Sequence, residues 1–435
     1  MLLKWRMQRI FHQFRHALIE PSRNPRTAVV LGRLLALVFL VCFGTGLYSH
    51  FLQDPLAWMV FPVRPLWLYQ VTQGIHITAG IACFPLIVAK LYAVFPELFQ
   101  TPAVRSFTHL LERASIALFV AASLVQLSIG LLNTYQFYSL FPFSFRSTHY
   151  VLSFVVVGSL AIHIGVKLTT IAQYWRKSNS LDESGALIVL KPEDDADFDI
   201  PDDLRRLTGR PQSTGITGRV FEWIDREPAP PEPDRRISTS RRGFFAAVGV
   251  AVTAVVGLTA GQSFRVLDAT NIFAPRKNGI GSQGLPVNRT ARAAEVIDLA
   301  SAPDWMLRVT NGTTAQQFSY DQLRALPQCE AVLPIACVEG WSQYAHWRGV
   351  RLRDLMDIVG APDSADVLIQ SLQTNSRYGT TSMQSEFVRD ELTLVALELD
   401  GDTLDLDHGY PARIIAPARP GVLQTKWLSS IEVIA

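Results

Sequence analysis

The sequence carries little charge for its length. Asp, Glu, Lys and Arg make up 18% of the 435 residues, whereas 49% are hydrophobic, a balance too apolar for an ordinary soluble chain. The net charge of +2 gives no reason to expect nucleic acid or a strongly acidic partner. The scarcity of charge therefore predicts a membrane portion in a chain of two or three domains.

Cysteine is also scarce. Four cysteines do not make a disulfide framework, and Cys42 and Cys83 lie inside apolar stretches, where they are expected to pack as small hydrophobic side chains. Cys329 and Cys337 remain as candidates for chemistry. A signal-peptide cleavage pattern is missing as well, because the basic start runs directly into a long apolar segment, so we expect the N-terminus to stay attached.

What the chain does contain is long apolar segments. Four of them, roughly 28–49, 67–95, 108–132 and 149–172, reach the ~20 residues that a membrane-spanning helix needs. We expect them to form one all-α four-helix bundle. A fifth segment, Phe244–Ala260, is shorter and richer in Ala, Val and Gly, which favours a separate anchor helix.

The rest of the chain differs in character. Acidic, Pro-rich residues before the fifth segment predict a flexible linker, and short alternating apolar runs after Gln262, such as WMLRVT and LSSIEVI, predict an α+β domain. The predicted order is a basic N-terminus (1–27), a membrane domain (28–175), a linker (176–243), an anchor (244–262) and a C-terminal domain (263–435).

Positive charges predict the topology, since short loops rich in Lys and Arg stay in the cytoplasm. The basic N-terminus is then inside, and four crossings return the chain to the cytoplasm at Arg176 and Lys177. The fifth segment would carry the C-terminal domain to the extracytoplasmic face.

The residues before the fifth segment, Ser240 to Phe245 (SRRGFF), resemble a twin-arginine export signal. That pathway carries folded proteins, so the motif implies a domain that folds around a cofactor and a place in the plasma membrane of a bacterium. The alternative is a basic flank of an ordinary helix.

Histidines in or near the apolar segments are the candidate haem ligands, because a histidine inside a membrane span is costly and usually functional. His149 and His163 are fourteen residues apart, or ~21 Å along one helical face, which suits two stacked haems. By depth, His76 pairs with His149 and His109 with His163, each as a bis-histidine haem. His50 is a spare candidate, and hydrogen bonding at a helix end is the alternative role for His50 and His109.

The arrangement over about 28–172 resembles the diheme b-type cytochrome subunits of bacterial respiratory dehydrogenases, although it lacks a histidine at the inner start of the first helix. The resemblance implies one or two b-type haems and exchange of electrons with membrane quinones. Gln70, Gln73 and Gln126 stay unassigned, because polar groups in spans more often satisfy a neighbouring group than bind a quinone.

Two blocks carry the chemistry of the C-terminal domain. IACVEGWS at Ile335–Ser342 and HGYPARIIAPARPGVLQTKWLSSIEVI at 408–434 resemble the sulfite-oxidase-type molybdenum-cofactor fold. The resemblance spans about 286–435 and is nearest to the catalytic subunits of periplasmic methionine sulfoxide reductases. It implies a molybdopterin cofactor whose molybdenum is bound by the thiolate of Cys337.

The same resemblance implies the residues that hold the cofactor. Arg413 and Lys426 would supply the cations that a buried pterin phosphate needs. Further contacts are expected from His408 and Ser371, from the backbone at Gln424 and Thr425, and from Asn288 and Arg289. The alternatives for Cys337 are a buried free thiol and a disulfide with Cys329.

The expected function is a membrane-bound oxidoreductase that carries electrons from quinol through the haems to molybdenum, where a small sulfoxide or N-oxide is reduced. One alternative is sulfite-type oxidation with electrons delivered to quinone, for which Arg348, Arg377 and Arg419 could bind the anion. The other is a cytochrome-anchored docking module without catalysis.

Overall fold

The computed structural model describes residues 2–18, 20, 22–99, 104, 106–138, 141–176, 215–225, 240–312 and 314–434. Most of the predicted linker, 177–214 and 226–239, lies outside these residues. The described chain divides into two compact units. The first comprises 1–39, 82–127 and 151–253, and the second comprises 40–81, 128–150 and 254–435.

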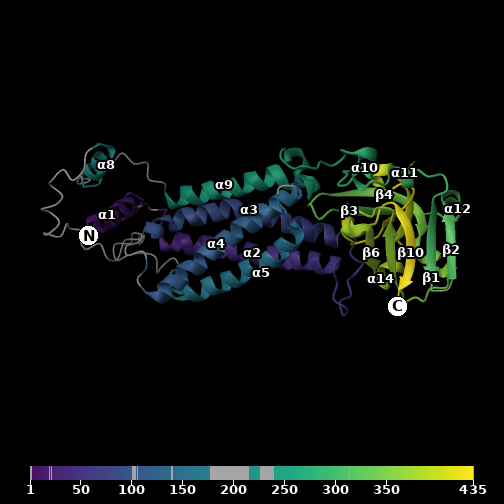
Figure 1. Ribbon diagram of the computed structural model, residues 1–435, viewed down its shortest axis with the longest axis horizontal. Helices are drawn as coiled ribbons and strands as arrows, with labels where there is room; N and C mark the ends of the chain where they lie inside the picture. Colours follow the sequence, from purple (N-terminus) through teal and green to yellow (C-terminus); the bar gives the residue numbers. More distant parts are fainter. Residues whose placement is uncertain are drawn as a thin grey trace. The chain divides into compact units, whose positions relative to one another are not determined.

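Helices make up the N-terminal part of the described chain (Figure 1). Among the described residues, five are long and apolar enough to cross a membrane, which agrees with the five predicted segments. These are α2 (Pro25–Gln53), α3 (Leu68–Val94, continued by η1, Phe95–Phe99), α4 (Phe107–Thr134), α5 (Phe145–Val166) and α9 (Arg241–Thr259). Shorter helices are α1 (Leu2–Ala17), α6 (Leu168–Gln173) and α8 (Gly215–Asp225).

Local sequence explains where several of these helices begin and end. Asn24 caps α2 by accepting a hydrogen bond from the Thr27 amide at 2.8 Å, and Pro25 occupies the first helical position, where its missing N–H costs nothing. Hydropathy predicts that the fourth segment extends to residue 172, but α5 ends at Val166. The backbone of Lys167 leaves the helical conformation there, and α6 starts anew.

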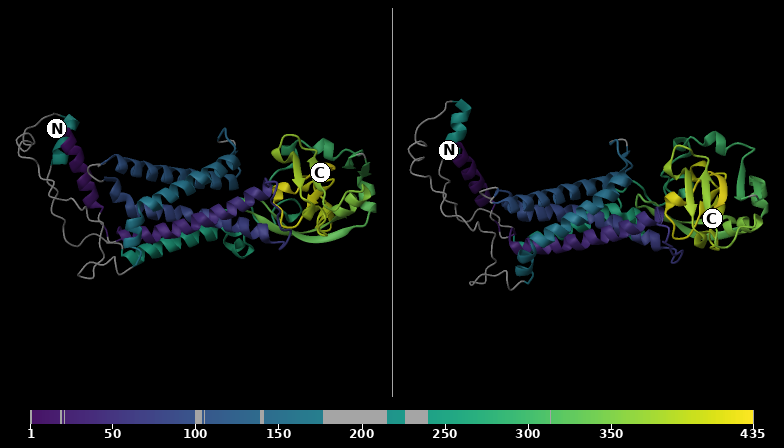
Figure 2. Two further views of the ribbon diagram at one scale, coloured as in Figure 1. Left: turned by 90° about the horizontal axis from the view of Figure 1, so that it is seen from below. Right: turned by 60° about the horizontal axis from the view of Figure 1, so that its bottom comes forward.

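The first unit is held together by one apolar core. Side chains of α2, α3, α4 and α5 form it, among them Leu31, Cys83 and Val156. Helix α9 packs against the same core through Phe244 and Val248, so these helices lie side by side, as both views in Figure 2 show. Cys83 is fully buried, in agreement with the packing role predicted for it.

The second unit contains two five-stranded sheets. One has the order β2-β1-β10-β5-β6 and the other β3-β4-β7-β8 with β9 paired to β7. The strands are β1 (Met306–Asn311), β2 (Thr314–Ser319), β3 (Cys329–Ala336), β4 (Ser342–Arg351), β5 (Asp366–Ser371), β6 (Thr380–Met383), β7 (Leu394–Leu399), β8 (Asp402–Thr403), β9 (Arg413–Ile415) and β10 (Leu428–Ile434).

Short helices connect and flank these strands. They are η4 (Ala260–Gln262), η5 (Arg265–Thr270), η6 (Ser282–Gly284), α10 (Ala291–Ala294), α11 (Ile297–Ala300), α12 (Tyr320–Ala325), α13 (Leu352–Ile358), η7 (Arg377–Gly379), α14 (Ser385–Val388), η8 (Leu406–His408) and η9 (Gly421–Leu423). The predicted α+β class of the C-terminal part is therefore confirmed. The run WMLRVT contains all of β1 except its last residue, and the run LSSIEVI forms β10.

Two apolar cores stabilise the second unit. The larger includes Leu307, Leu355 and Ile431 and also takes in Leu52 and Tyr69 from α2 and α3. The smaller includes Trp341 and Trp347 beside Cys337. The ends of α2 and α3 therefore belong to the same compact unit as the sheets.

Candidate functional site

The motif CVEGW folds as a tight turn between β3 and β4. The Cys337 amide donates to the Trp341 carbonyl at 2.9 Å, and the Gly340 amide donates back to the Cys337 carbonyl at 3.0 Å. Gly340 has φ +99°, a conformation that glycine adopts at no steric cost. The turn directs the Cys337 side chain into a pocket whose lining consists of Pro286, Asn288, Ile335, Cys337, Trp341, His408, Arg413, Gly421 and Lys426.

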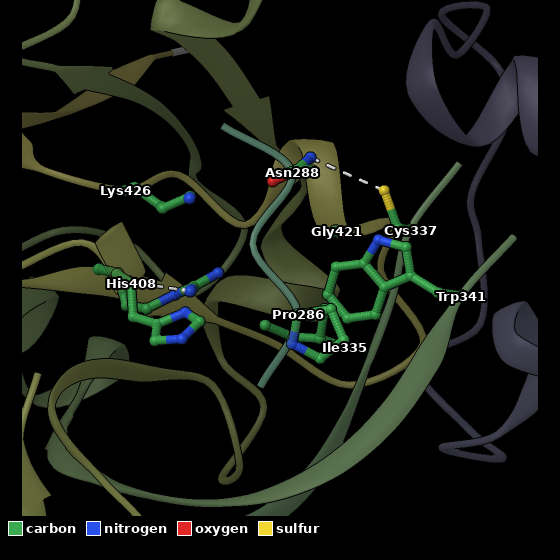
Figure 3. A pocket seen from close by; sticks show the side chains of 9 residues that line it. Pro286, Asn288, Ile335, Cys337, Trp341, His408, Gly421 and Lys426 are labelled. Atoms are coloured by element: carbon green, nitrogen blue, oxygen red, sulfur yellow. Dashed lines mark hydrogen bonds between the residues drawn. The ribbon is translucent and has the colours of Figure 1, made fainter. Parts of the chain in front are cut away.

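The Cys337 thiol is the buried nucleophilic group of this pocket. Its side chain is 1% exposed, and burial, together with the nearby charge of Glu339, raises the pKa of the thiol well above its usual value. The Asn288 amide lies 3.7 Å from Sγ (Figure 3). A thiol in this setting stays protonated by itself, but a bound metal ion displaces the proton and stabilises the thiolate.

Two cations, the buried Arg413 and the half-buried Lys426, line the opposite side of the pocket. The guanidinium of Arg413 donates to the carbonyls of His408 at 2.9 Å and Gln424 at 3.3 Å. The Lys426 ammonium donates to the carbonyls of Arg289 at 2.8 Å and Asp407 at 2.7 Å. Burial lowers the pKa of Arg413 to about 9. Burial, reinforced by Arg413, lowers the pKa of Lys426 to about 7.

These cations have backbone carbonyls as hydrogen-bond partners, and a carbonyl carries no full charge to balance theirs. Burying uncompensated charge is costly, so the arrangement fits a bound anion. A phosphate provides such an anion, and Arg with Lys is a usual pair to hold one. The donor set of the pocket, one thiol and two cations, therefore fits a molybdopterin whose metal lies at Cys337 and whose phosphate lies toward Arg413 and Lys426.

His408 is buried beside Arg413. Its Nε2 lies 2.6 Å from the Ser282 carbonyl, which can only accept, so Nε2 carries the proton and Nδ1 is left as an acceptor. Burial and the Arg413 charge lower the pKa of His408 to about 4. At neutral pH the ring is uncharged and can accept a hydrogen bond from a pterin N–H.

Five of the nine residues predicted to bind the cofactor line the pocket, and the other four do not. Asn288, Cys337, His408, Arg413 and Lys426 line it. The other four support the lining. Ser371 donates to the Lys426 carbonyl at 2.7 Å, Arg289 donates to Asn375 Oδ1 at 2.6 Å, Gln424 donates to the Arg419 carbonyl at 3.0 Å, and Thr425 contacts Thr381 at 2.8 Å.

Sequence reasoning missed Gly421, which also lines the pocket. A Cβ atom at this position would lie 3.1 Å from the Ala336 carbonyl oxygen and 3.6 Å from Cys337 Cα. The glycine thus allows the chain of η9 to approach the Cys337 backbone closely. The only available signal was the glycine itself in the motif ARPGVLQ.

A disulfide between Cys329 and Cys337 is excluded by the strand that separates them. Cys329 begins β3 and Cys337 follows its last residue, so eight steps of an extended strand, at ~3.3 Å per residue, place them roughly 26 Å apart. A disulfide needs Cα atoms within about 7 Å. Both cysteines are free thiols, and Cys337 is available to a metal.

Two of the predicted haem ligands face one another in the second unit. The rings of His76 and His149 have their centroids 6.1 Å apart at an angle of 74°. An iron between two imidazoles, at metal–nitrogen distances of about 2 Å, would separate the ring centres by roughly 6 Å. The spacing therefore fits a shared metal.

Contacts behind these rings are also suited to iron ligation. His76 Nδ1 lies 2.9 Å from the Cys42 carbonyl, so it carries the proton and leaves Nε2 as the coordinating atom. Gly46 faces this ring, since a Cβ there would lie 3.0 Å from His76 Cε1, and Gly130 faces His149 in the same way at 3.3 Å.

The other histidines have different surroundings. His163 stacks on Phe119 in the first unit, with ring centroids 5.7 Å apart. The His109 amide donates to Ser106 Oγ at 3.1 Å, a cap at the start of α4. The proposed pairing of His109 with His163 stays a prediction. His50 stacks face to face on Tyr150, with centroids 3.6 Å apart.

The three arginines considered for an anion site do not line the pocket. Arg348 forms an ion pair with Glu398 at 3.0 Å, and Arg377 forms one with Asp54 at 2.9 Å. Arg419 donates to the carbonyls of Leu423 at 3.1 Å and Ser382 at 2.5 Å. Each therefore has partners that stabilise the fold.

Comparison with known proteins adds to this geometry. Residues 293–435 match the family described as oxidoreductase molybdopterin binding domain. The chain is 29% identical over 116 residues to YedZ1 of Azospira oryzae, which is named as a protein-methionine-sulfoxide reductase subunit, covering 27% of this chain and 43% of that protein. It is 30% identical over 115 residues to the oxidoreductase YuiH of Bacillus subtilis, covering 26% and 57%.

The chain is also 32% identical over 105 residues to the sulfite oxidase of Arabidopsis thaliana, covering 21% of this chain and 27% of that protein. In each case the chain spans less than two thirds of the relative's length. The segment that matches the family, residues 293–435, includes Cys337, His408, Arg413 and Lys426, the residues that meet in the pocket. The C-terminal part of this chain is an oxidoreductase molybdopterin-binding domain of the sulfite oxidase superfamily.

Proposed function

We propose that this chain is a membrane-bound oxidoreductase that passes electrons between the quinone pool, b-type haems and a molybdenum cofactor, and that it reduces a small sulfoxide or N-oxide. The observation that carries the proposal is the buried Cys337 thiol facing two cations, the buried Arg413 and the half-buried Lys426, across one pocket. The five apolar helices support attachment to a membrane, and the charge pattern favours the bacterial plasma membrane with the C-terminal domain outside the cytoplasm.

When bound, a molybdenum cofactor supplies oxygen-atom transfer and stores two electrons. The residues of the chain provide its surroundings. Cys337 would give a soft thiolate ligand, Arg413 and Lys426 would neutralise the phosphate, and neutral His408 would accept a hydrogen bond from the pterin. Asn288, within 3.7 Å of the sulfur, is placed to donate to the thiolate and hold it in one orientation.

The haem part of the proposal rests on the facing rings of His76 and His149. Their spacing of 6.1 Å suits a six-coordinate iron that transfers single electrons and leaves no open position for substrate. His109 and His163 are proposed for a second haem. Quinone enters the proposal as the electron donor in the bilayer.

Reduction is favoured over sulfite-type oxidation by the placement of the arginines. Arg348, Arg377 and Arg419 have partners elsewhere in the fold, and the cations that do line the pocket are the two assigned to the phosphate. Similarity to a protein named for methionine sulfoxide reduction supports the same choice. Similarity to sulfite oxidases keeps sulfite oxidation as the second candidate.

Metal analysis and two assays test the proposal. The purified full-length chain should contain near-stoichiometric molybdenum, and Cys337→Ser should lose most of it, whereas Cys329→Ser should retain it. Reduced dye should be oxidised on adding methionine sulfoxide. Rapid dye reduction by sulfite instead would reverse the proposed direction, and haem without molybdenum in the native protein would identify a docking module.

The haem assignment has its own spectroscopic test. The reduced protein should show b-type absorption bands, and His76→Ala should weaken them. The matched control is His346→Ala, because His346 lies on β4, is 46% exposed and has Glu330 as its partner. Unchanged bands in His76→Ala would rule out this residue as a ligand.

A further inference from the structure

The turn that carries Cys337 is held by side-chain amides from three separate segments. Gln73, on α3, donates to the Val338 carbonyl at 2.9 Å. Gln136, in the turn after α4, donates to Glu339 Oε1 at 2.6 Å. Gln262, at the end of η4, donates to the Glu339 carbonyl at 3.3 Å. All of these residues belong to the second compact unit.

These contacts are buried and tightly packed. Gln73 and Gln262 are 5% and 2% exposed. Each side-chain amide therefore donates the hydrogen bond that water would donate to the same carbonyl if the turn were exposed. Ser263 adds a hydrogen bond to the Gly340 carbonyl at 2.5 Å. Gly340 lies so near α3 that a Cβ atom there would approach Ile77 Cγ1 to 2.9 Å. The turn is therefore shaped against the helix end as well as by its own strands.

Gln136 joins the two chain segments that flank the Cys337 sulfur. Besides Glu339, its amide donates to the Asn288 carbonyl at 3.1 Å, while its own Oε1 accepts from Arg276 at 2.9 Å. Gln136 has φ +59°. This backbone conformation is uncommon for residues other than glycine and often occurs at functional sites. This backbone conformation places the amide between Asn288 and Glu339.

Gln73 also links the turn to the histidine pair. It precedes His76 by three residues on α3, and residues three apart lie on the same face of a helix. The Val338 carbonyl, one residue from Cys337, is thus hydrogen-bonded to a side chain one helical turn from His76.

We propose that Gln73, Gln136 and Gln262 are positioning residues which fix the Cys337 turn against the ends of the membrane helices, so that the geometry of the molybdenum ligand depends on the membrane part of the same chain. This inference rests on the proposed function, since it concerns how Cys337 presents its sulfur to the metal. It assigns a role to glutamines that neither the motif nor the family match identifies.

The test compares near-isosteric variants that remove one amide from the full-length protein. Gln73→Met and Gln136→Met should alter the electron paramagnetic resonance signal of Mo(V). They should also slow the oxidation of pre-reduced haem by methionine sulfoxide about 10-fold or more, the usual effect of removing a hydrogen bond behind a metal ligand. Loss of molybdenum with haem retained would support the same conclusion, because a displaced turn cannot ligate.

Gln384→Met is the matched control. Its amide donates to the Met59 carbonyl at 2.7 Å, which is the same kind of contact in the same unit but does not involve the Cys337 turn. This variant should keep the wild-type spectrum and haem oxidation rate. Gln73→Glu, which retains the shape of the side chain but replaces the donor with an acceptor, should behave like Gln73→Met.

The inference is overturned if Gln73→Met and Gln136→Met both keep the wild-type Mo(V) signal and a haem oxidation rate within twofold of wild type. It is equally overturned if Gln384→Met changes both readouts as much as they do, because the effect would then be one of general stability. Absence of molybdenum from the wild-type protein would instead defeat the proposed function, so the two failures are distinguishable.

Discussion

Buried charge is the main feature of the site at the scale of single residues. Arg413 and Lys426 are held by carbonyl groups, and burial lowers the pKa of each, Lys426 to about 7. A chain without the cofactor therefore carries a destabilising pair of cations. Binding of a phosphate reverses this, because an anion nearby favours the charged form of both groups.

Arg413 should hold the cofactor in a way that lysine cannot reproduce. Its planar guanidinium donates to two carbonyls at once and lies 5.0 Å from the centroid of the Trp347 ring, whereas lysine is a point charge that loses its proton when buried. Hydrogen bonds of a charged group are worth ~1.5–3 kcal/mol, or roughly 10- to 150-fold in binding. Arg413→Lys should lose cofactor at least 10-fold faster in dialysis.

The control for this substitution is Arg348→Lys. Arg348 forms a partly exposed ion pair with Glu398 and lies outside the pocket. The Arg348→Lys variant should therefore release cofactor at the wild-type rate. Equal cofactor release from Arg413→Lys and the wild-type protein would mean that Arg413 does not contact the bound group.

His408 predicts how the stability of the cofactor-free chain depends on pH. The pKa of its ring falls from an ordinary value of 6.5 to about 4 in the fold, through burial and then Arg413. Between these values the unfolded chain binds a proton that the folded chain does not, so stability rises with pH over this window. From pH 5 to pH 7 the gain should be about 2 kcal/mol.

Denaturant unfolding of the full-length cofactor-free protein, followed by tryptophan fluorescence, measures this gain. His408→Gln should remove most of the slope, because glutamine does not titrate. If the variant shows the same rise between pH 5 and pH 7 as the wild type, other groups cause it.

At the scale of elements, close packing between helices determines how the rings of His76 and His149 are placed. Gly46 on α2 and Gly130 on α4 provide the space into which the rings of His76 and His149 fit. Glycine weakens a helix by roughly 1 kcal/mol relative to alanine, so its use here has a packing reason. The same helix α2 contains Gly44, where a Cβ would meet nothing within 4 Å.

This pair of glycines gives a matched test. Gly46→Ala should lower the b-haem content of the purified protein at least severalfold, because a methyl group 3.0 Å from His76 Cε1 displaces the ring from its metal-binding orientation. Gly44→Ala makes the same change in helix propensity and should leave the haem content unchanged. A normal haem spectrum in Gly46→Ala would argue against His76 as a ligand.

At the scale of the whole molecule, the question is which side of the membrane the C-terminal domain occupies. Arg241 and Arg242 begin helix α9, and paired arginines at this place resemble a twin-arginine signal. If that pathway moves the folded domain outward, Arg241→Lys combined with Arg242→Lys should leave it in the cytoplasm. A protease added to spheroplasts should then no longer cleave it.

The control for the topology test is a second arginine pair in the same chain, Arg205 and Arg206. Replacing both with lysine should leave the domain accessible to protease outside the cell. If the wild-type domain is itself protected in intact spheroplasts, the proposed orientation is wrong.

The sequence by itself determined the five apolar helices, the α+β class of the C-terminal part and the motif around Cys337. It could do so because span length, alternation of apolar residues and a short motif are local properties that need no partner elsewhere in the chain. His408, Arg413 and Lys426 were also identifiable, since they lie in one continuous block resembling a known fold.

Only the tertiary structure decided which of these residues meet. It separated Cys329 from Cys337 by the length of β3, gave Arg348, Arg377 and Arg419 partners outside the pocket, and brought Gln136 to Glu339 across 203 positions of sequence. Hydrogen bonds over such distances depend on how helices and sheets pack together, and no local pattern encodes that packing. A glutamine in an apolar segment looks the same in sequence whether it satisfies a neighbouring turn or holds a metal-binding loop.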